Sequence, residues 1–225
     1  MEQAYTERDA ALRWTGLASL TALVFWLAVA CGGSGVPPEL RALAELDRGR
    51  DLEDAGNLEK ALQAYHSAVN LDPRSAEAYV RRGSVYFQFD DQNRAMGDMN
   101  QALRLDPDVA EAYNYRGLIL ASADSPVAAF LEFAKAIELD PTAIEPYLNR
   151  GRMYVEQQDL ESALADLDSA LAIDSQNAEL YLDRAGIYMM LGNTARATVD
   201  LEQVLAVTQE EAFILVAKQL LALIR

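Results

Sequence analysis

The sequence predicts an all-α protein in which five similar helix-turn-helix repeats of 34 residues follow one another along the chain. The first observation is a triplet, Leu-Asp-Pro at residues 71–73, 105–107 and 139–141, which returns as Ile-Asp-Ser at 173–175. The second is that other positions keep the same step of 34 residues, and no insertion breaks the register. The third is that apolar residues within each half-repeat recur at the spacing of one helix face. A period of this length is typical of proteins built from one supersecondary unit repeated in series.

Several positions of the repeat carry one residue type in successive repeats. A Gly inside a helix costs roughly 1 kcal/mol relative to Ala, so we expect close helix-to-helix approach at the Gly positions, with the Ala positions of the second helix as the opposing surface. The members of the aromatic, Gly, Ala and bulky apolar columns are Tyr79, Tyr113, Tyr147 and Tyr181; Gly49, Gly83, Gly117 and Gly151; Ala61, Ala95, Ala129, Ala163 and Ala197; and Tyr65, Met99, Phe133, Leu167 and Leu201.

Turn and capping residues mark the ends of the helices in the repeat. Gly56-Asn57 and Gly192-Asn193 tolerate a positive φ between the two helices of their repeats. The Pro of the Leu-Asp-Pro triplet is expected to stop the second helix. Two pairs have the spacing of a capping box at the start of the following helix: Asp108 with Glu111, and Thr142 with Glu145.

The order aromatic, Gly, Tyr, Ala, bulky apolar and Pro resembles the tetratricopeptide repeat (TPR) signature in residue type and period. The resemblance covers residues 42–211, and the fifth repeat departs from it because Ala185 and Gln209 replace Gly and Pro. It implies a right-handed TPR superhelix, an α-solenoid of five repeats, followed by a C-terminal capping helix at residues 212–225. It also implies a protein-protein interaction scaffold whose first helices line a concave groove for a peptide or protein partner.

By this resemblance, the groove is lined by the residue after the opening aromatic and by residues about four and seven positions further on. The lining is mostly apolar, which suits an extended or helical peptide with apolar anchors. The alternative is that some of these side chains only pack between neighbouring first helices. The candidate partner-groove residues are Val80, Phe87, Asn114, Leu118, Leu148, Arg152, Val155, Leu182 and Met189, with Ser84, Ala121 and Gly186 at further positions of the same pattern.

An Arg precedes the Gly position in every repeat, and an acidic residue recurs on the second helix of repeats two to five. The acids are Asp98, Glu132, Asp166 and Asp200. Because a partly buried Arg is normally paired, we interpret this column as repeated inter-helix ion pairs with a structural role. The alternative is a cationic ladder for an anionic ligand. The column consists of Arg48, Arg82, Arg116, Arg150 and Arg184.

The pattern of residues 1–30 is typical of an export signal. A polar start precedes an uncharged apolar run from Trp14 to Ala30, in the order that such signals share. The run ends at Cys31, the only Cys, and Ala28-Val29-Ala30-Cys31 resembles the lipobox of bacterial lipoproteins. That resemblance implies lipidation of Cys31, with residues 31–41 as a flexible tether. The alternative is a single transmembrane anchor, since about twenty residues cross a bilayer. Either way, we expect an exported chain anchored to the bacterial envelope membrane.

Composition narrows the function classes. The formal net charge of −16 disfavours nucleic-acid phosphate as a partner. The sequence shows no catalytic constellation, phosphate loop or metal-ligand spacing, so we expect no enzyme, cofactor or metal. The single His, His66, is expected to be a solvated surface residue.

The sequence therefore predicts a membrane-tethered adaptor in envelope assembly or recruitment. The alternative is a structural subunit that self-associates, for example as a homodimer, through its C-terminal helix. Apolar residues spread around most of that helix, whereas its polar residues form one narrow stripe. The apolar residues are Phe213, Ile214, Leu215, Val216, Leu220, Leu221, Leu223 and Ile224.

Overall fold

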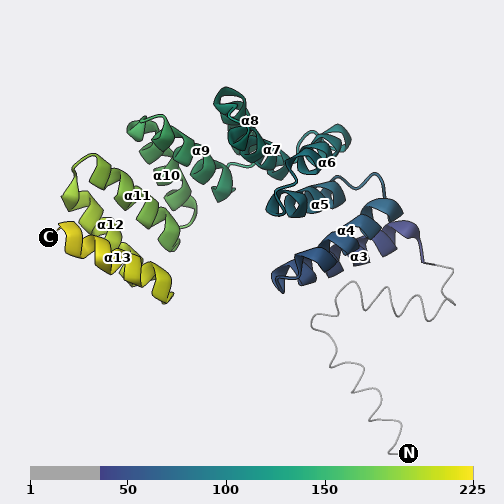
Figure 1. Cartoon of the computed structure of the whole chain (residues 1–225), viewed down its shortest axis with the longest axis horizontal. Coiled ribbons are helices and arrows are strands. Elements are labelled where there is room, and N and C mark those ends of the chain that lie inside the picture. Colours follow the sequence, from purple (N-terminus) through teal and green to yellow (C-terminus); the bar gives the residue numbers. More distant parts are fainter. Residues whose placement is uncertain (1–35, 225) are drawn as a thin grey trace, which may run out of the picture. The chain divides into compact units, whose positions relative to one another are not determined.

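A computed structural model describes residues 36–224 of the 225-residue chain. The signal segment, Cys31 and most of the tether lie outside the described residues. Within residues 36–224, every regular element is an α-helix (Figure 1), as the sequence predicts. No helix in this range is both long and apolar enough to cross a membrane.

Five helix pairs and one last helix make up this part of the chain (Figure 1). First helices from repeat two on begin at residues 76, 110, 144 and 178, and second helices begin at 58, 92, 126, 160 and 194, so the period of 34 residues holds throughout. The helices are α3 (Pro38–Asp54), α4 (Leu58–Leu71), α5 (Ala76–Gln88), α6 (Gln92–Leu105), α7 (Ala110–Ser122), α8 (Pro126–Leu139), α9 (Ile144–Glu156), α10 (Leu160–Ile173), α11 (Ala178–Met190), α12 (Thr194–Val207) and α13 (Glu211–Ile224).

The turn inside each repeat contains one residue in the left-handed region. Gly56 (φ 72°) and Gly192 (φ 70°) occupy this position in repeats one and five, as their sequence predicts. Repeats two, three and four carry Asp90 (φ 59°), Asp124 (φ 54°) and Gln158 (φ 61°) at the same place. An L-residue with a side chain is strained at positive φ, and Asp tolerates it better than Gln. The turn geometry is therefore common to all five repeats even where Gly is absent.

In repeats one to four, the second helix ends at the residue before the Asp of the triplet, and this Asp, not the Pro, is the C-cap residue. The amide of Asp72 and the amide of Asp140 still donate to Ala carbonyls of the preceding turn, and each carboxylate accepts the amide two residues on. Asp174 does the same in repeat four, where Ser replaces Pro and the helix ends at the equivalent residue. A local side-chain turn of this kind competes with helix continuation. The Pro is therefore not required to end the helix.

The two predicted capping boxes are wrong. Helix α7 begins at Ala110 and helix α9 at Ile144, and neither has a side-chain cap. Thr142 instead donates both its hydroxyl and its amide to Asp140. The helices start two residues after the polar residues on which the prediction relied. Side-chain caps are found at the N-terminal ends of other helices, from Asn57, Ser75, Asp91, Asp159, Asn177 and Asn193.

The chain divides into two compact parts, an N-terminal unit ending at Pro107 and a C-terminal unit starting at Asp108. The N-terminal unit holds repeats one and two, whose core gathers around Leu46, Tyr65 and Val85. The C-terminal unit holds repeats three to five and α13, with cores around Phe133, Leu167 and Leu201 and their Ala neighbours.

The Gly column lies against the bulky apolar column of the second helix. A Cβ built on Gly49 would lie within 3 Å of the Tyr65 ring, and a Cβ built on Gly83 would lie 2.6 Å from the Met99 methyl carbon. The sequence predicts close approach at these glycines, which is confirmed, but it assigns the opposing surface to the Ala column. The Ala column contributes only backbone carbonyls there, such as that of Ala95 at 3.4 Å.

Helix α13 packs against both helices of repeat five. Its Ala217 and Leu221 are buried in one cluster with residues of α11 and α12. The outward positions of α13 include three exposed apolar side chains, Leu215, Val216 and Leu223. The helix therefore covers the end of the C-terminal unit and still presents apolar side chains to solvent.

Candidate functional site

The Arg column forms inter-helix ion pairs in repeats two to five. In each, the Arg Nε donates at 2.8–3.0 Å and its Nη2 at 2.5–2.7 Å to the two oxygens of one carboxylate sixteen residues on. Two parallel bonds to one carboxylate combine geometric specificity with strength. The pairs are Arg82 with Asp98, Arg116 with Glu132, Arg150 with Asp166 and Arg184 with Asp200.

Repeat one lacks this arrangement. Ala64 occupies the position of the acid and Glu45 that of the opening Tyr. Arg48 bonds the carboxylate of Glu45 at 3.2 Å, and its side chain is 59% exposed, against 15–23% for the four paired arginines. In three of the four pairs, the Arg also lies over the ring of the opening Tyr of its repeat. The distances from guanidinium carbon to ring centroid are 5.3–5.7 Å, for Arg82 with Tyr79, Arg116 with Tyr113 and Arg184 with Tyr181.

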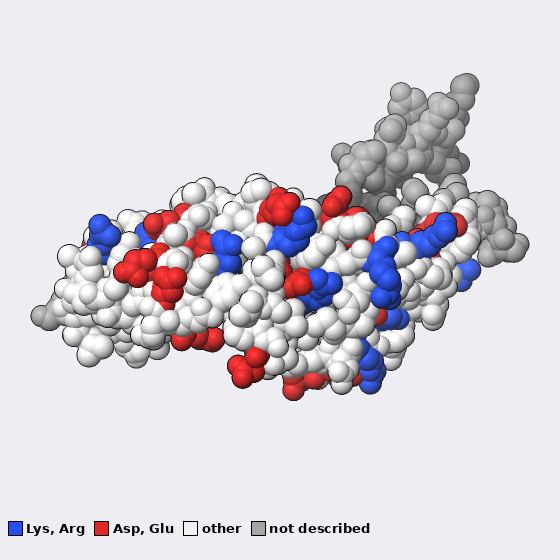
Figure 2. Space-filling view, turned by 90° about the horizontal axis from the view of Figure 1, so that it is seen from above, with Lys and Arg blue, Asp and Glu red and all other residues white. Residues whose placement is uncertain are grey.

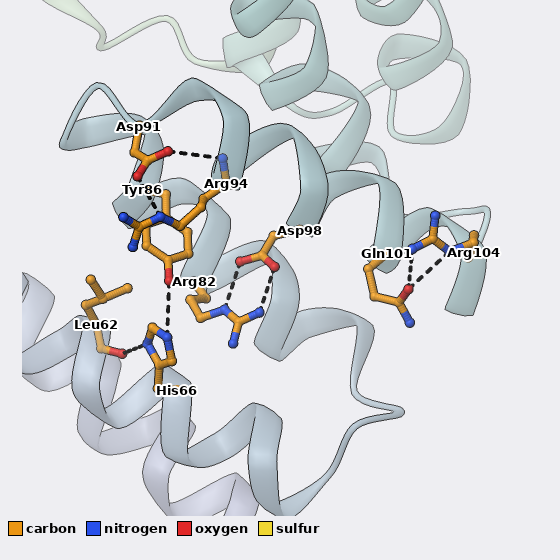
Figure 3. A network of polar contacts seen from close by, with 9 residues as sticks. All are labelled: Leu62, His66, Arg82, Tyr86, Asp91, Arg94, Asp98, Gln101 and Arg104. Atoms are coloured by element: carbon orange, nitrogen blue, oxygen red, sulfur yellow. Dashed lines mark hydrogen bonds and ion pairs between the residues drawn. The ribbon is translucent and has the colours of Figure 1, made fainter.

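His66 is not a solvated surface residue. Figure 3 shows its ring between the Leu62 carbonyl oxygen, 3.0 Å from Nδ1, and the Tyr86 hydroxyl, 3.1 Å from Nε2. The Arg94 guanidinium lies over the Tyr86 ring and pairs with Asp91. The sequence predicts a solvated His66 from its polar helical position. This prediction is wrong because the side chain faces the next repeat rather than solvent. Its contacts join α4 to α5 within the N-terminal unit.

Two candidate groove residues are buried. Val80 is 1% exposed. Asn114 is 7% exposed, and its side-chain oxygen accepts a hydrogen bond of 3.0 Å from the Asn149 amide. These side chains are not accessible to a partner, so the alternative of packing between first helices applies to them.

The other candidates reach the surface to different degrees. Arg152 is exposed, and the remaining apolar candidates are half-buried. Several of these also touch the core, for example Leu118 beside the Phe133 cluster and Leu148 beside the Leu167 cluster. The half-buried candidates are Phe87, Leu118, Leu148, Val155, Leu182 and Met189.

The C-terminal unit contains a cavity of about 420 Å³ that brings three candidates together. Nine of its ten lining residues belong to helices α9 and α11, and Leu167 of α10 is the tenth. Arg152, Val155 and Leu182 line it, as does Gly186, which follows the same predicted pattern. Leu148 and Met189 do not. The remaining lining residues are Gly151, Glu156, Asp183, Ile187 and Met190.

The charged rim of this cavity is mainly acidic. Arg152 bridges from α9 to α11, where its Nη2 donates to Glu179 at 2.5 Å and to Asp183 at 3.1 Å. Burial raises the pKa of the Asp183 carboxyl, and the Arg152 charge opposes that shift. Glu156 adds a further exposed carboxylate. Two carboxylates thus pair with the Arg152 guanidinium and Glu156 lines the same cavity, an excess of negative charge that favours a cation.

Sequence reasoning missed Glu156, Asp183 and Met190 as lining residues. Each lies one residue beyond a predicted groove position, so a wider window around that pattern includes them. Within residues 36–224, no cluster of three or more His, Cys, Asp or Glu side chains is arranged to hold a metal ion. Figure 2 shows acidic and basic side chains next to each other at several places on one face, not gathered into one basic patch.

Three family models match the chain. Models described as tetratricopeptide repeat match residues 150–222 and 91–144, and one described as TPR repeat matches residues 49–89. Together they span most of the region with the period of 34 residues. No curated protein sequence matches the chain significantly.

Solved structures of TPR proteins share the fold. YrrB, described as a TPR protein with an unusual peptide-binding site, is 23% identical with a TM-score of 0.56, over 79% of this chain and 92% of that chain. A repeat protein of Parabacteroides merdae is 23% identical with a TM-score of 0.66, over 99% and 84%. A thermophilic protein of Thermus thermophilus is 18% identical with a TM-score of 0.67, over 81% and 98%. At these identities, the likeness establishes the fold.

Proposed function

This chain is a tetratricopeptide repeat protein, and we propose that it is a membrane-tethered adaptor that binds a peptide or protein partner through its first helices. TPR folds generally mediate protein-protein interaction. The observation that carries the proposal is the cavity between α9 and α11, because it gathers three of the predicted groove residues and is mostly apolar. Apolar concave sites with a few polar groups are typical of ligand binding. The peptide-binding site for which YrrB is named supports this choice by analogy.

The proposal places the chain at the bacterial envelope. The apolar run that ends at Cys31 is its basis. A lipid on Cys31, or alternatively a transmembrane anchor in the same segment, holds the repeats near the membrane. In this setting the adaptor recruits its partner for envelope assembly. The function is binding, without catalysis.

Affinity capture tests the binding function. The full-length chain is used to retain partners from membranes of the source cells, and bound proteins are identified by mass spectrometry. Met190 lines the cavity and is 52% exposed, so Met190→Lys should preserve the fold and reduce the recovery of a specific partner. Val127 on α8 is 75% exposed and outside the cavity, so Val127→Lys is the matched control. Equal recovery with both variants contradicts a binding site in this cavity.

A second candidate function is self-association through α13. Leu215, Val216 and Leu223 expose apolar side chains on that helix, and exposed apolar patches mark interfaces. Sedimentation of the full-length chain in a neutral detergent provides the test. Self-association through α13 predicts a dimer that the double substitution Leu215→Lys and Leu223→Lys converts to a monomer. A monomeric unsubstituted chain excludes this function.

A further inference from the structure

Gly186 lies in the middle of α11 without a packing reason for being Gly. A Cβ built on Gly186 meets no heavy atom within 4 Å, in contrast to one on Gly49 or Gly117. Gly186 also lies within a regular helix, Ala178–Met190, and has no positive φ that would call for Gly. A mid-helix Gly with free space beside it destabilises a helix relative to Ala. The packing of the C-terminal unit therefore does not account for this residue.

The missing side chain opens the cavity. Gly186 is one of the residues that line it. Repeat three carries Leu118 at the same repeat position, and helix α7 accommodates that side chain. A Leu is thus compatible with the backbone at this position of the repeat. At position 186, however, a side chain would extend from α11 toward space that the cavity now occupies.

The cavity has the chemistry of a side-chain pocket. Its volume of about 420 Å³ falls within the ~300–1,000 Å³ typical of ligand sites. Val155, Leu182 and Ile187 provide apolar walls, and Met190 adds an adaptable thioether side chain. Such a lining favours an apolar group of the ligand over a polar one.

The rim selects the charge next to that apolar group. Arg152 already has Glu179 and Asp183 as partners. Glu156 is a further carboxylate in the lining of the cavity. An acidic ligand would meet these carboxylates and would have to compete for Arg152. A Lys or Arg of the ligand is attracted instead, since unlike charges across an interface give specificity.

We propose that this pocket, opened by Gly186, receives one bulky apolar side chain of the partner, and that a Lys or Arg next to it in the partner faces Glu156 and Asp183. The inference rests on the proposed binding function and names the ligand chemistry of one site. It makes Gly186 a specificity-determining residue.

Labelled synthetic peptides test the proposal. Three peptides share Ala-Gly flanks and differ in their centre, which is Lys-Phe-Lys, Lys-Ala-Lys or Glu-Phe-Glu. Their binding to the full-length chain is measured by fluorescence anisotropy at two salt concentrations. We expect the Lys-Phe-Lys peptide to bind at least tenfold more tightly than either of the others. Higher salt should weaken its binding, because the charged rim is partly exposed.

Two glycine variants separate the pocket from helix stability. Gly186→Leu should lower the affinity for the Lys-Phe-Lys peptide at least tenfold without lowering the melting temperature. Gly97 on α6 is another helical Gly whose added Cβ meets no heavy atom within 4 Å, and it lies outside the pocket. Gly97→Leu should leave the affinity unchanged.

Other results of the binding measurements would contradict either the pocket, the ligand chemistry or the proposed function. If the Lys-Phe-Lys peptide binds but Gly186→Leu has no effect, the pocket is not the site, although the binding function stands. If none of the peptides binds while the full-length chain still captures its partner from membranes, the apolar and basic ligand chemistry is wrong. If neither the peptides nor a partner is bound, the proposed function itself is wrong.

Discussion

Gly117 lies against the ring of Phe133, so that a Cβ added to Gly117 would come within 2.6 Å of the ring carbon Cε1. At the equivalent two positions of repeat four, the contact is looser. Opposite Gly151 stands Leu167, whose Cγ would be 4.0 Å from an added Cβ. Repeat five carries Ala185 opposite Leu201. How far the side chain on the second helix reaches toward the first therefore decides whether the first helix needs a Gly: Phe133 and the Met99 methyl reach it, whereas Leu167 does not.

We predict opposite effects of the same substitution in two repeats. Gly117→Ala should lower the free energy of unfolding by about 1–3 kcal/mol, because the Phe133 ring must shift within the core. Gly151→Ala should raise it by about 0.5–1 kcal/mol, because its added Cβ meets its nearest neighbour at 3.6 Å and Ala is the better helix former. Urea denaturation of both variants checks the prediction. A loss of stability in Gly151→Ala as large as that in Gly117→Ala would contradict it.

A second prediction concerns the Arg column. Arg82→Ala should destabilise the chain by about 1–3 kcal/mol, because it leaves the Asp98 carboxylate without its two guanidinium bonds in a site where Asp98 is 7% exposed. Arg48→Ala is the control in the same unit, and its effect should be within about 0.5 kcal/mol, since Arg48 makes only an exposed contact. Thermal and urea unfolding measure both. Equal effects of the two substitutions would show that the inter-helix pair is not structural.

The third prediction addresses the turn in repeat four. Gln158 has a φ of 61°, whereas repeats one and five use Gly at the same position. Gln158→Gly should therefore stabilise the chain, by about 1 kcal/mol, because it relieves the left-handed conformation of a residue with a Cβ. The reverse change, Gly192→Gln, should destabilise it by a similar amount. If Gln158→Gly instead lowers the unfolding midpoint, the turn is not strained.

Features that repeat with the chain could be predicted from sequence. The 34-residue period predicted the five helix pairs, and matching periods of Arg and acid predicted their contact. Contacts between the first helices of neighbouring repeats could not be predicted in this way. The burial of Val80 and the Asn114–Asn149 hydrogen bond depend on how one first helix packs on the next. The cavity lies beside Gly186, and because each of repeats two to five carries a different residue at this position, the sequence gives no periodic signal for it.

The fourth prediction concerns the anchor. Cys31 is the only Cys of the chain and follows the apolar run. Cells fed a clickable fatty acid should label the protein, and Cys31→Ser should abolish the label and leave an unprocessed chain of higher apparent mass. Substituting Ser34→Ala in the tether is the control and should leave the label unchanged. An unlabelled chain that stays in the membrane at its original mass would show that residues 14–33 are a transmembrane anchor instead.

Site-specific photo-crosslinking in the source cells tests the central claim of partner binding most directly. A benzophenone amino acid replaces Glu156, an exposed residue that lines the cavity, or Val127, which is 75% exposed on α8 outside it. Neither position belongs to the core, so both labelled chains should fold. Binding through the first helices predicts a discrete crosslinked product from position 156 that Gly186→Leu abolishes, with none from position 127. Equal products from both positions, or products from position 127 alone, would contradict the proposed binding surface.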